Sequence, residues 1–240
     1  SARNREVKKE QYIEFFSNGN TDGVIIYGSN LDDEDLMRRR AQMKFPFVVI
    51  ENEIENVNIN SVIVDNIYGS KMAVDHLTGL GCKKIMHVTG DKFVKASLKR
   101  WQGYLDAMKA HQLQDYISVI ECEKFGIEAG YKAIKTWLES HTRSQLPEAI
   151  YFGADNTAFG GMMALEDAGI RIPEDIRIVG FDDDRPWQVG RKLKQLTSLR
   201  QPLYEMGQKS VQLLVHQIDH PEAEKQTIIM KPELIVRETT

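Results

Sequence analysis

Short apolar runs alternate along the chain with longer segments in which apolar residues recur every three or four positions. The runs are rich in Val and Ile and nearly continuous in hydrophobicity, which is typical of parallel strands buried on both faces. Seven strands are predicted, over residues 23–27, 47–50, 61–64, 84–88, 117–121, 149–152 and 176–181. The longer segments have the spacing of amphipathic helices and cover residues 9–18, 32–43, 67–80, 96–111, 127–141, 157–168 and 203–220.

The repeated strand–helix order predicts an α/β protein with parallel sheets. Gly81 and Gly169 follow two of the predicted helices, where a residue in the left-handed conformation commonly ends a helix. A chain of 240 residues is long enough for one large or two small apolar cores. The strands are too many and too scattered for one small sheet, so we expect two doubly wound lobes.

The composition narrows the possible partners. A net charge of −4 argues against nucleic-acid binding by this segment itself, because phosphate contacts need clustered Lys and Arg. Cys82 and Cys122 lie far apart and have no metal-site or CxxC spacing. Two free thiols fit a reducing cytoplasm, although a disulfide between them is also compatible with the sequence. No apolar run approaches the length of a membrane span, so we expect no membrane partner.

A candidate site follows from the strand positions, because ligands of open parallel sheets bind beyond the carboxyl ends of the strands. The residues that follow the predicted strands include carboxylates, an amide, a guanidinium and aromatic rings. They are Ser29, Asn30, Asp65, Asn66, Tyr68, Asp91, Arg100, Phe125, Asp155 and the run 182–184. Such a mixture suits a neutral polyol, whose hydroxyls bind carboxylate and Arg groups and whose C–H face packs on aromatic rings. The excess of acidic groups argues against a phosphate.

Each of these residues also has a purely structural interpretation. The 155–156 pair could cap the helix predicted at residue 157, an interpretation to which we give equal weight. For the 65–66 pair we favour a cap or turn role. The 182–184 run could form an exposed turn or bind calcium, although no EF-hand spacing follows it. Arg100 could lie on the surface, and Phe125 could fill a core.

The motifs of several enzyme classes are absent from the sequence. No GxSxG elbow, Walker loop or GxGxxG after a strand occurs, and we expect no metal or cofactor. His216 and His220 have an i,i+4 spacing, but Gln217 stands where the zincin motif has Glu. Asp155 and Asp182 could form a pair of catalytic carboxylates, so a sugar-acting enzyme is an alternative. We favour a binding module and predict that the chain is not an enzyme.

Several short blocks occur in one order from about Gly23 to the C-terminus. They are Val64-Asp65-Asn66 with Gly69, Ala73, His76-Leu77 and Leu80-Gly81; Arg100 with Gly103-Tyr104; Pro147 to Ile150 with Asp155, Ala158, Gly160, Ala164-Leu165 and Gly169; Ile172 to Ile176 with Val179 to Asp183; Leu196-Thr197-Ser198 with Gln201-Pro202 and Met206-Gly207; and Glu233 to Thr240. The block from 172 to 183 is the most specific. Together the blocks resemble the lac-repressor (LacI/GalR) family of transcription regulators.

The resemblance implies two periplasmic-binding-protein-like (type I) lobes joined by three crossovers, with an effector in the cleft between them. We expect an N-terminal lobe of residues 1–89 plus 202–221 and a C-terminal lobe of residues 90–201 plus 222–240. The crossovers are then expected near Gly90, Arg200 and Glu222. The family's DNA-binding helix-turn-helix is absent from this chain. The N-terminal lobe also lacks the family's first strand and helix, so we expect further residues upstream of Ser1 in the native protein.

The resemblance also implies the effector contacts. By position, Tyr68, Arg100, Phe125, Asp182 and Gln201 fall on the family's effector-binding residues. Arg100 and Asp182 are expected to bind ligand hydroxyls, Phe125 to stack, and Gln201 to lie at a crossover. A further candidate, Asp155, matches a family Asp that serves the helix N-terminus more than the ligand. Ala154 stands where some members have a polar contact, which leaves the ligand preference open.

The predicted protein is a cytoplasmic repressor core that binds a mono- or disaccharide and forms a homodimer. Effector binding would then change the DNA affinity of the missing head. A periplasmic sugar-binding protein of a transport system is the main alternative, and a purine, a sugar phosphate or a phosphocarrier protein are alternative effectors. The sequence does not decide which sugar binds, whether it induces or corepresses, which operator is recognised, or whether dimers form tetramers.

Overall fold

A computed structural model of the chain describes residues 21–28, 45–52, 57–186 and 192–240, together with the single positions 15, 19, 38 and 41. The helices predicted at 9–18 and 32–43 therefore lie outside the described residues, as do Ser29 and Asn30. The chain divides into two compact units. The first unit contains Ser1–Asp65, Phe93–Ala96 and Pro202–Met230, and the second contains Asn66–Lys92, Ser97–Gln201 and Lys231–Thr240.

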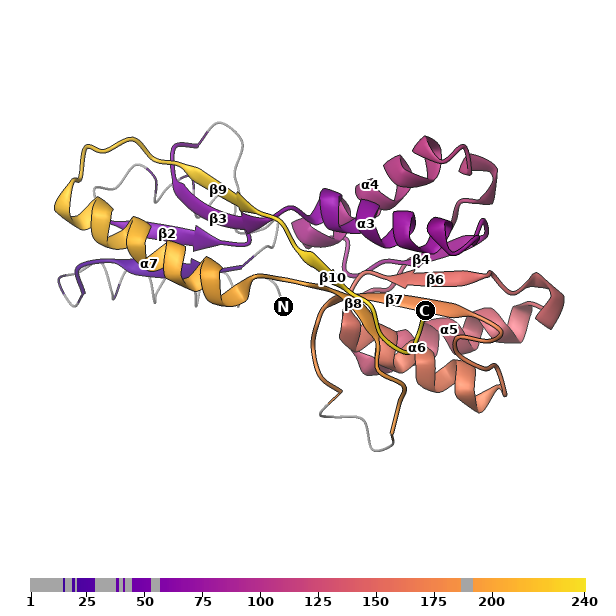
Figure 1. The fold of residues 1–240 in the computed structure, drawn as a ribbon. Helices are drawn as coiled ribbons and strands as arrows, with labels where there is room; N and C mark the ends of the chain where they lie inside the picture. Colours follow the sequence, from indigo (N-terminus) through magenta and orange to yellow (C-terminus); the bar gives the residue numbers. More distant parts are fainter. Residues whose placement is uncertain are drawn as a thin grey trace. The chain divides into compact units, whose positions relative to one another are not determined.

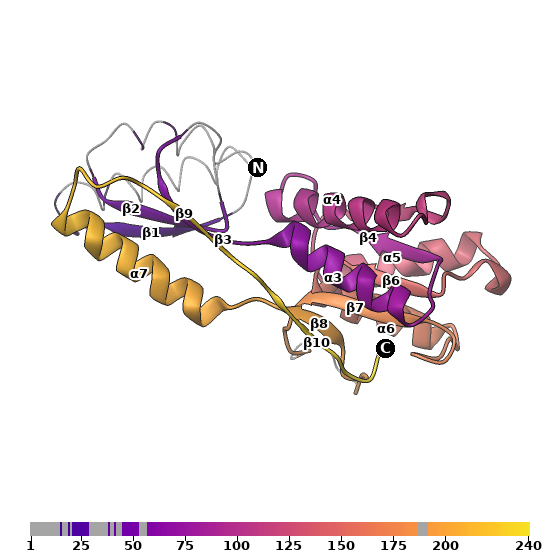
Figure 2. The same ribbon diagram turned by 45° about the horizontal axis from the view of Figure 1, so that its top comes forward.

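The first unit is built on a four-stranded parallel sheet (Figure 1). Its strands are ordered β1 (Val24–Tyr27), β2 (Phe47–Ile50), β3 (Asn60–Val64) and β9 (Thr227–Met230). Helix α7 (Leu203–Asp219) packs along this sheet against β1, β2 and β3 (Figure 2). A small apolar core of the first unit contains Phe47, Val49 and Ile59, with Val24 and Ile26 packed against it.

The second unit contains a six-stranded sheet ordered β10-β8-β7-β6-β4-β5. Its strands are β4 (Ile85–Val88), β5 (Ser118–Ile120), β6 (Ala149–Phe152), β7 (Arg177–Asp182), β8 (Thr197–Arg200) and β10 (Glu233–Ile235). All neighbouring pairs are parallel except β8 and β10, which are antiparallel. Because β4 and β6 are buried at every position, they need the nearly continuous apolar sequence from which they were predicted.

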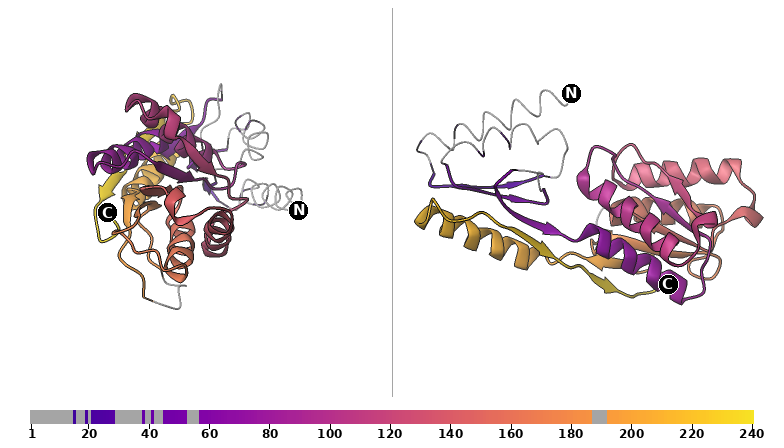
Figure 3. Two further views of the ribbon diagram at one scale, coloured as in Figure 1. Left: turned by 90° about the vertical axis from the view of Figure 1, so that its right-hand side faces the viewer. Right: turned by 90° about the horizontal axis from the view of Figure 1, so that it is seen from above.

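Helices cover both faces of the six-stranded sheet (Figure 3). One face carries α3 (Asn66–Gly79) and α4 (Lys95–Ala110), and the other carries α5 (Ile127–Ser140) and α6 (Asp155–Asp167). Two 3₁₀ turns, η2 (Gln114–Tyr116) and η3 (Arg143–Gln145), complete the unit. Helices α5 and α6 touch backbone to backbone, because a Cβ at Gly130 or Gly160 would overlap a carbonyl of the partner helix. Only glycine permits this approach.

The α/β fold with two parallel-sheet lobes was predicted correctly, and all seven expected strands are present. Three strands were missed: β8, β9 and β10. Cys82 and Cys122 are buried free thiols, so the disulfide alternative is wrong. Burial raises the pKa of the Cys122 thiol to about 11. None of the helices in the described ranges is long and apolar enough to cross a bilayer.

The boundary between the units differs from the predicted one. The expected N-terminal lobe ran to residue 89, but β4 lies between β5 and β6 in the second unit's sheet. The expected C-terminal lobe began again at residue 222, but β9 pairs with β3 in the first unit. The chain passes between the units at residues 65–66, 201–202 and 230–231, and the short segment 93–96 is also grouped with the first unit. Strand pairing decides these positions, and the pairing cannot be read from the local apolar pattern.

Candidate functional site

Arg100 is the centre of a polar cluster at the carboxyl ends of the strands of the second unit. It projects from the first turns of α4 and is only 4% exposed, so the interpretation as a surface Arg is wrong. Its Nε donates to Asn66 Oδ1 at 2.8 Å, and its Nη1 donates to the Gly153 carbonyl at 2.6 Å. The guanidinium carbon also lies 3.7 Å from the ring centroid of Phe181. These contacts fix the plane of the guanidinium group.

The charge of Arg100 is balanced by Asp182 at the end of β7. Nη1 of Arg100 lies 3.1 Å from Asp182 Oδ1, which also accepts a hydrogen bond from Gln201 Nε2 at 2.6 Å. A buried guanidinium needs such a partner, because an uncompensated buried charge is strongly destabilising. Burial raises the pKa of Asp182, while the charge of Arg100 and the hydrogen bond from Gln201 oppose this rise.

Two groups of this cluster have no partner among the described residues. They are Nη2 of Arg100, which can donate, and Oδ2 of Asp182, which can accept. The side chain of Asp182 is 30% exposed, so solvent or a ligand can reach it. The two side chains are hydrogen-bonded to each other, so this free donor and this free acceptor belong to one pair. A ligand hydroxyl group can accept a hydrogen bond from the donor and donate one to the acceptor.

The Asp182–Asp184 run is not an exposed turn, because its carboxylates are hydrogen-bonded. It is not a set of metal ligands either. The carboxylate of Asp183 accepts hydrogen bonds from Arg200 Nε at 2.6 Å and from Arg237 Nη2. Burial alone would raise the pKa of Asp183, but these two arginines lower it overall. Asp184 Oδ2 accepts a hydrogen bond from Asn156 Nδ2 at 3.0 Å. The described residues contain no group of three or more His, Cys, Asp or Glu placed to hold a metal ion.

Asp155 lies behind this run and is fully buried. Its Oδ1 accepts a hydrogen bond from Ser198 Oγ at 2.7 Å, and its Oδ2 accepts one from the Asp184 amide, also at 2.7 Å. Burial, reinforced by the negative charge of Asp182, raises the pKa of Asp155 to about 7. The cap interpretation is wrong, because α6 begins at Asp155 itself and both carboxylate oxygens bond elsewhere.

The two aromatic candidates both belong to the second unit. Tyr68, in the first turn of α3, is 37% exposed, and Lys231 Nζ lies 4.7 Å from its ring centroid. Phe125, in the loop between β5 and α5, is half-buried. Its ring lies against Gly90, where any Cβ would overlap it. Phe125 therefore depends on a glycine after β4 and is not a core residue.

Two members of the cluster were not predicted from the sequence, and a third was assigned another role. Asn66 was favoured as a cap or turn residue, but its Oδ1 is bonded to Arg100. The Gly153 carbonyl and the ring of Phe181 were not considered. Gly153 directly follows β6, so the rule about strand ends could have drawn attention to it. No sequence signal identifies Phe181, because it resembles any other buried strand residue.

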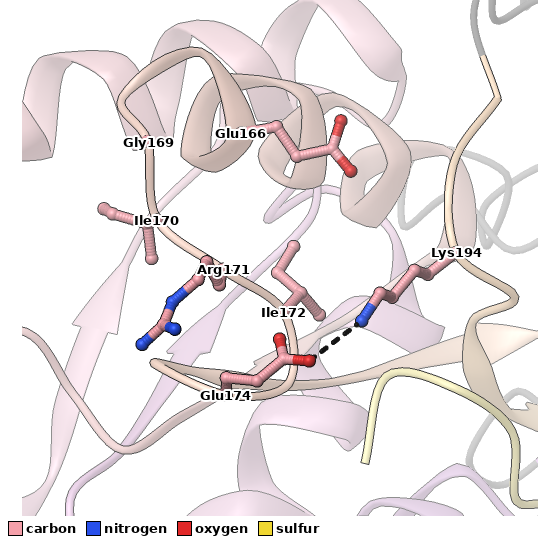
Figure 4. Close-up of a pocket in the computed structure, with 7 residues that line it drawn as sticks. All are labelled: Glu166, Gly169, Ile170, Arg171, Ile172, Glu174 and Lys194. Atoms are coloured by element: carbon pink, nitrogen blue, oxygen red, sulfur yellow. Dashed lines mark hydrogen bonds and ion pairs between the residues drawn. The ribbon is translucent and has the colours of Figure 1, made fainter.

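Two surface depressions occur elsewhere on the second unit. One, of about 460 Å³, lies at the C-terminal end of α6 and before β7, where Lys194 Nζ is 3.3 Å from Glu174 Oε1 (Figure 4). It contains none of the predicted site residues, and its Lys194 and Arg171 are already paired, with Glu174 and Asp175. Another, of about 410 Å³, borders Asp183, Arg200 and Arg237, whose charged groups are bonded to one another. The Arg100–Asp182 pair is the better candidate because it leaves polar groups unpaired.

Known proteins resemble both the sequence and the fold. Residues 74–240 match the family model of the periplasmic binding protein-like domain. A ribose operon repressor of Halalkalibacterium halodurans is 31% identical over 237 residues, covering 98% of this chain and 67% of that protein. A regulatory protein of LacI family from Chloroflexus aggregans has a solved structure with a TM-score of 0.83 and 29% identity, covering 98% of this chain and 82% of that one.

A second solved structure is a LacI family transcriptional regulator from Enterococcus faecium with bound ribose. It has a TM-score of 0.78 and 27% identity, and the match covers 96% of this chain and 83% of that one. The matched blocks, the two parallel sheets and these relatives agree with one another. The chain belongs to the LacI/GalR family of transcriptional regulators, as its periplasmic-binding-protein-like, effector-binding core.

Proposed function

We propose that the second unit binds a neutral sugar through Arg100 and Asp182. The observation that carries this proposal is the pair of unused groups, Arg100 Nη2 and Asp182 Oδ2, on two side chains already bonded to each other. A sugar hydroxyl both donates and accepts, so one hydroxyl, or two adjacent ones, satisfies both groups. A phosphate would satisfy Arg100 but would repel Asp182 and the nearby carboxylates of Asp155 and Asp183.

Three further residues complete the proposed site. The exposed part of the Tyr68 ring and the half-buried ring of Phe125 offer flat apolar surfaces for the C–H face of a sugar. Gln201 donates through Nε2 to Asp182, which leaves its Oε1 for a ligand hydroxyl. These roles are the ones expected from the family resemblance. The hydrogen-bond pattern supports them for Gln201, and the exposure of the rings supports them for Tyr68 and Phe125.

The relatives indicate which sugars to test first. One is named for a ribose operon, and another was solved with bound ribose. D-ribose is therefore the first probe, within the wider class of mono- and disaccharides.

We further propose that sugar binding controls a DNA-binding head in a homodimer in the cytoplasm. The support is that the relatives are transcriptional regulators and that the chain spans about two thirds of the length of the curated relatives it matches. Regulators are not enzymes, which supports a binding function without catalysis. The same relatives favour a regulator over a transport receptor, the main alternative. Coupling requires only that the sugar binds one state of the protein more tightly than the other.

A thermal-shift screen tests the proposed ligand class. The panel contains D-ribose, other mono- and disaccharides, sugar phosphates and nucleobases. A ligand at a hundred times its Kd adds about 2.7 kcal/mol to the stability of the folded state, which for a chain of this size means roughly 5–10 °C. We expect a neutral sugar to give the largest shift. A shift with sugar phosphates or nucleobases alone would reject the neutral-sugar proposal.

A further inference from the structure

The turn that carries Asp182 has a strained backbone. Asp182 has a φ of +121° and Asp183 a φ of +59°, and neither is glycine. Two consecutive non-glycine residues with positive φ are held only where surrounding contacts over-determine them. The contacts that hold this turn therefore also hold the acceptor of the proposed sugar site.

The backbone amides of the two residues after Asp182 are both linked to the Asp155 carboxylate by hydrogen bonds. The Asp184 amide donates directly to Asp155 Oδ2 at 2.7 Å. The Asp183 amide donates to Ser198 Oγ at 3.1 Å, and Ser198 Oγ in turn donates to Asp155 Oδ1 at 2.7 Å. One carboxylate at the start of α6 thus joins the end of β7 to β8.

Asp155 itself has no room for a ligand. It is fully buried, each carboxylate oxygen already accepts a hydrogen bond, and a Cβ at Gly180 would overlap Oδ1. Its carboxylate therefore faces the underside of the turn and not the open side of the cluster.

We propose that Asp155 is a positioning residue of the sugar site, which holds the Asp182–Asp184 turn from behind and does not contact the sugar. This proposal rests on the proposed function, because it assigns Asp155 a role in that same site. It differs from the sequence-based prediction, which counted Asp155 among the candidate effector contacts.

The substitution Asp155→Asn distinguishes a role in holding the turn from a direct contact with the sugar. An Asn side chain can accept from the Asp184 amide through its oxygen and donate to Ser198 Oγ through its nitrogen, so it can keep both links. Asp155→Ala removes both links and leaves the Asp183 and Asp184 amides without their support. A matched control is Met162→Ala, which opens a cavity at another fully buried position of α6.

The first measurement is the affinity for D-ribose by calorimetric titration of the 240-residue chain. We expect affinity within about threefold of the parent in Asp155→Asn, a loss of more than tenfold in Asp155→Ala, and no more than a threefold change in Met162→Ala. Parent-like affinity in Asp155→Ala would overturn the proposal. Equal losses in Asp155→Asn and Asp155→Ala would show that the carboxylate itself contacts the sugar.

A pH series distinguishes the two roles further. The titratable groups around Asp155 are Asp182 on β7, Asp183 and Asp184 after it, and Tyr151 on β6. Both links to the turn survive protonation of Asp155, because a carboxyl group can accept through one oxygen and donate through the other. We therefore expect the affinities of the parent and Asp155→Asn to follow the same curve from pH 6 to 8. A parent-only loss of affinity below pH 7 would identify Asp155 as a contact.

Amide hydrogen exchange tests the turn without any ligand. The Asp183 and Asp184 amides should be protected in the parent and in Asp155→Asn, and should exchange at least tenfold faster in Asp155→Ala. Unchanged exchange in Asp155→Ala would overturn the proposal even if no sugar binds. If the parent does not bind D-ribose but the exchange result holds, the assignment of the sugar fails while the role of Asp155 in the turn stands.

Discussion

The two units differ in how completely their own residues cover their sheets. In the second unit, two helices lie on each face, and β4 and β6 are buried at every position. In the first unit, Ile25 and Tyr27 of β1 are 38% and 70% exposed. Alternation along the strand places them on the face opposite Val24 and Ile26, which pack into the small core. The sheet of the second unit is thus covered on both faces, whereas β1 of the first unit has exposed apolar side chains on one face.

Helix α7 shows the same incompleteness. Tyr204, Val211, Val215 and Ile218 are between 36% and 81% exposed, and their spacing places them along one side of the helix. Gly23, two residues before Ile25, lies so close to α7 that a Cβ there would be 2.8 Å from Leu214 Cδ1. The uncovered parts of α7 and β1 thus belong to one side of this sheet.

The largest effect should come from the closed core of the second unit. Phe152→Ala removes a fully buried ring from β6 and should lower the free energy of unfolding by about 3–5 kcal/mol. The matched change in the first unit, Tyr204→Ala, removes a ring that is 81% exposed and should change it by no more than about 0.5 kcal/mol. Urea unfolding followed by circular dichroism measures both. Similar losses would contradict the contrast between the units.

Arg100→Ala tests whether the second unit carries the site by itself. The loss of a charge-assisted donor should weaken D-ribose binding by roughly 1.5–3 kcal/mol, or about 10- to 150-fold in Kd. Lys109→Ala, at an exposed position of the same helix, is the control and should bind as the parent does. Calorimetric titration gives both values, and unchanged affinity in Arg100→Ala would remove Arg100 from the site.

A pH effect on stability should also originate in the second unit. The pKa of Asp155 is about 7 in the folded chain, above its ordinary value, because burial opposes the charged form. Its contribution to stability is complete below the ordinary pKa of an Asp and is lost as the pH rises through 7. From pH 6 to 8 the parent should lose roughly 1 kcal/mol of stability more than Asp155→Asn. Parallel unfolding curves for the two proteins would contradict this.

The smallest effect on stability should come from the uncovered side of α7. Val211→Lys with Val215→Lys should change the free energy of unfolding by no more than about 0.5 kcal/mol, because both side chains are already half-exposed. The same double variant should reduce self-association of the 240-residue chain in sedimentation experiments, because exposed apolar patches favour association. A large loss of stability would show that these side chains are covered.

The sequence predicted the structure correctly where the burial of a residue follows from the local hydrophobic pattern. Strands such as β4 and β6 are buried at every position and almost wholly apolar, so their sequence identifies them. Strand length does not explain why β8, β9 and β10 were missed, because β4 and β6 also have only four residues. Strands β8 and β10 contain charged or hydroxyl side chains instead of a continuous apolar run. The unit boundaries were misplaced because strand pairing between distant segments leaves no local trace.

The candidate site was predicted in part for a similar reason. The rule about strand ends, together with the family resemblance, selected Arg100, Asp182 and Gln201, which the structure brings into direct contact. The same reasoning could not separate Asp155 from these residues. Its position after β6 is also that of a ligand contact, and only its bonds to Ser198 and Asp184 support the different role proposed for it. Which side of a strand end faces a ligand depends on three-dimensional packing.

The hydrogen bonds of the Arg100–Asp182 pair reach two of the places where the chain changes units. Asn66, bonded to Arg100, is the first residue of the second unit, and Gln201, bonded to Asp182, is the last before the chain leaves it. A molecule that binds the free Nη2 of Arg100 and Oδ2 of Asp182 would add bonds to a network that already restrains the backbone at these two places. The occupancy of the proposed site and the torsional freedom of the backbone at residues 66 and 201 would then depend on one connected set of hydrogen bonds.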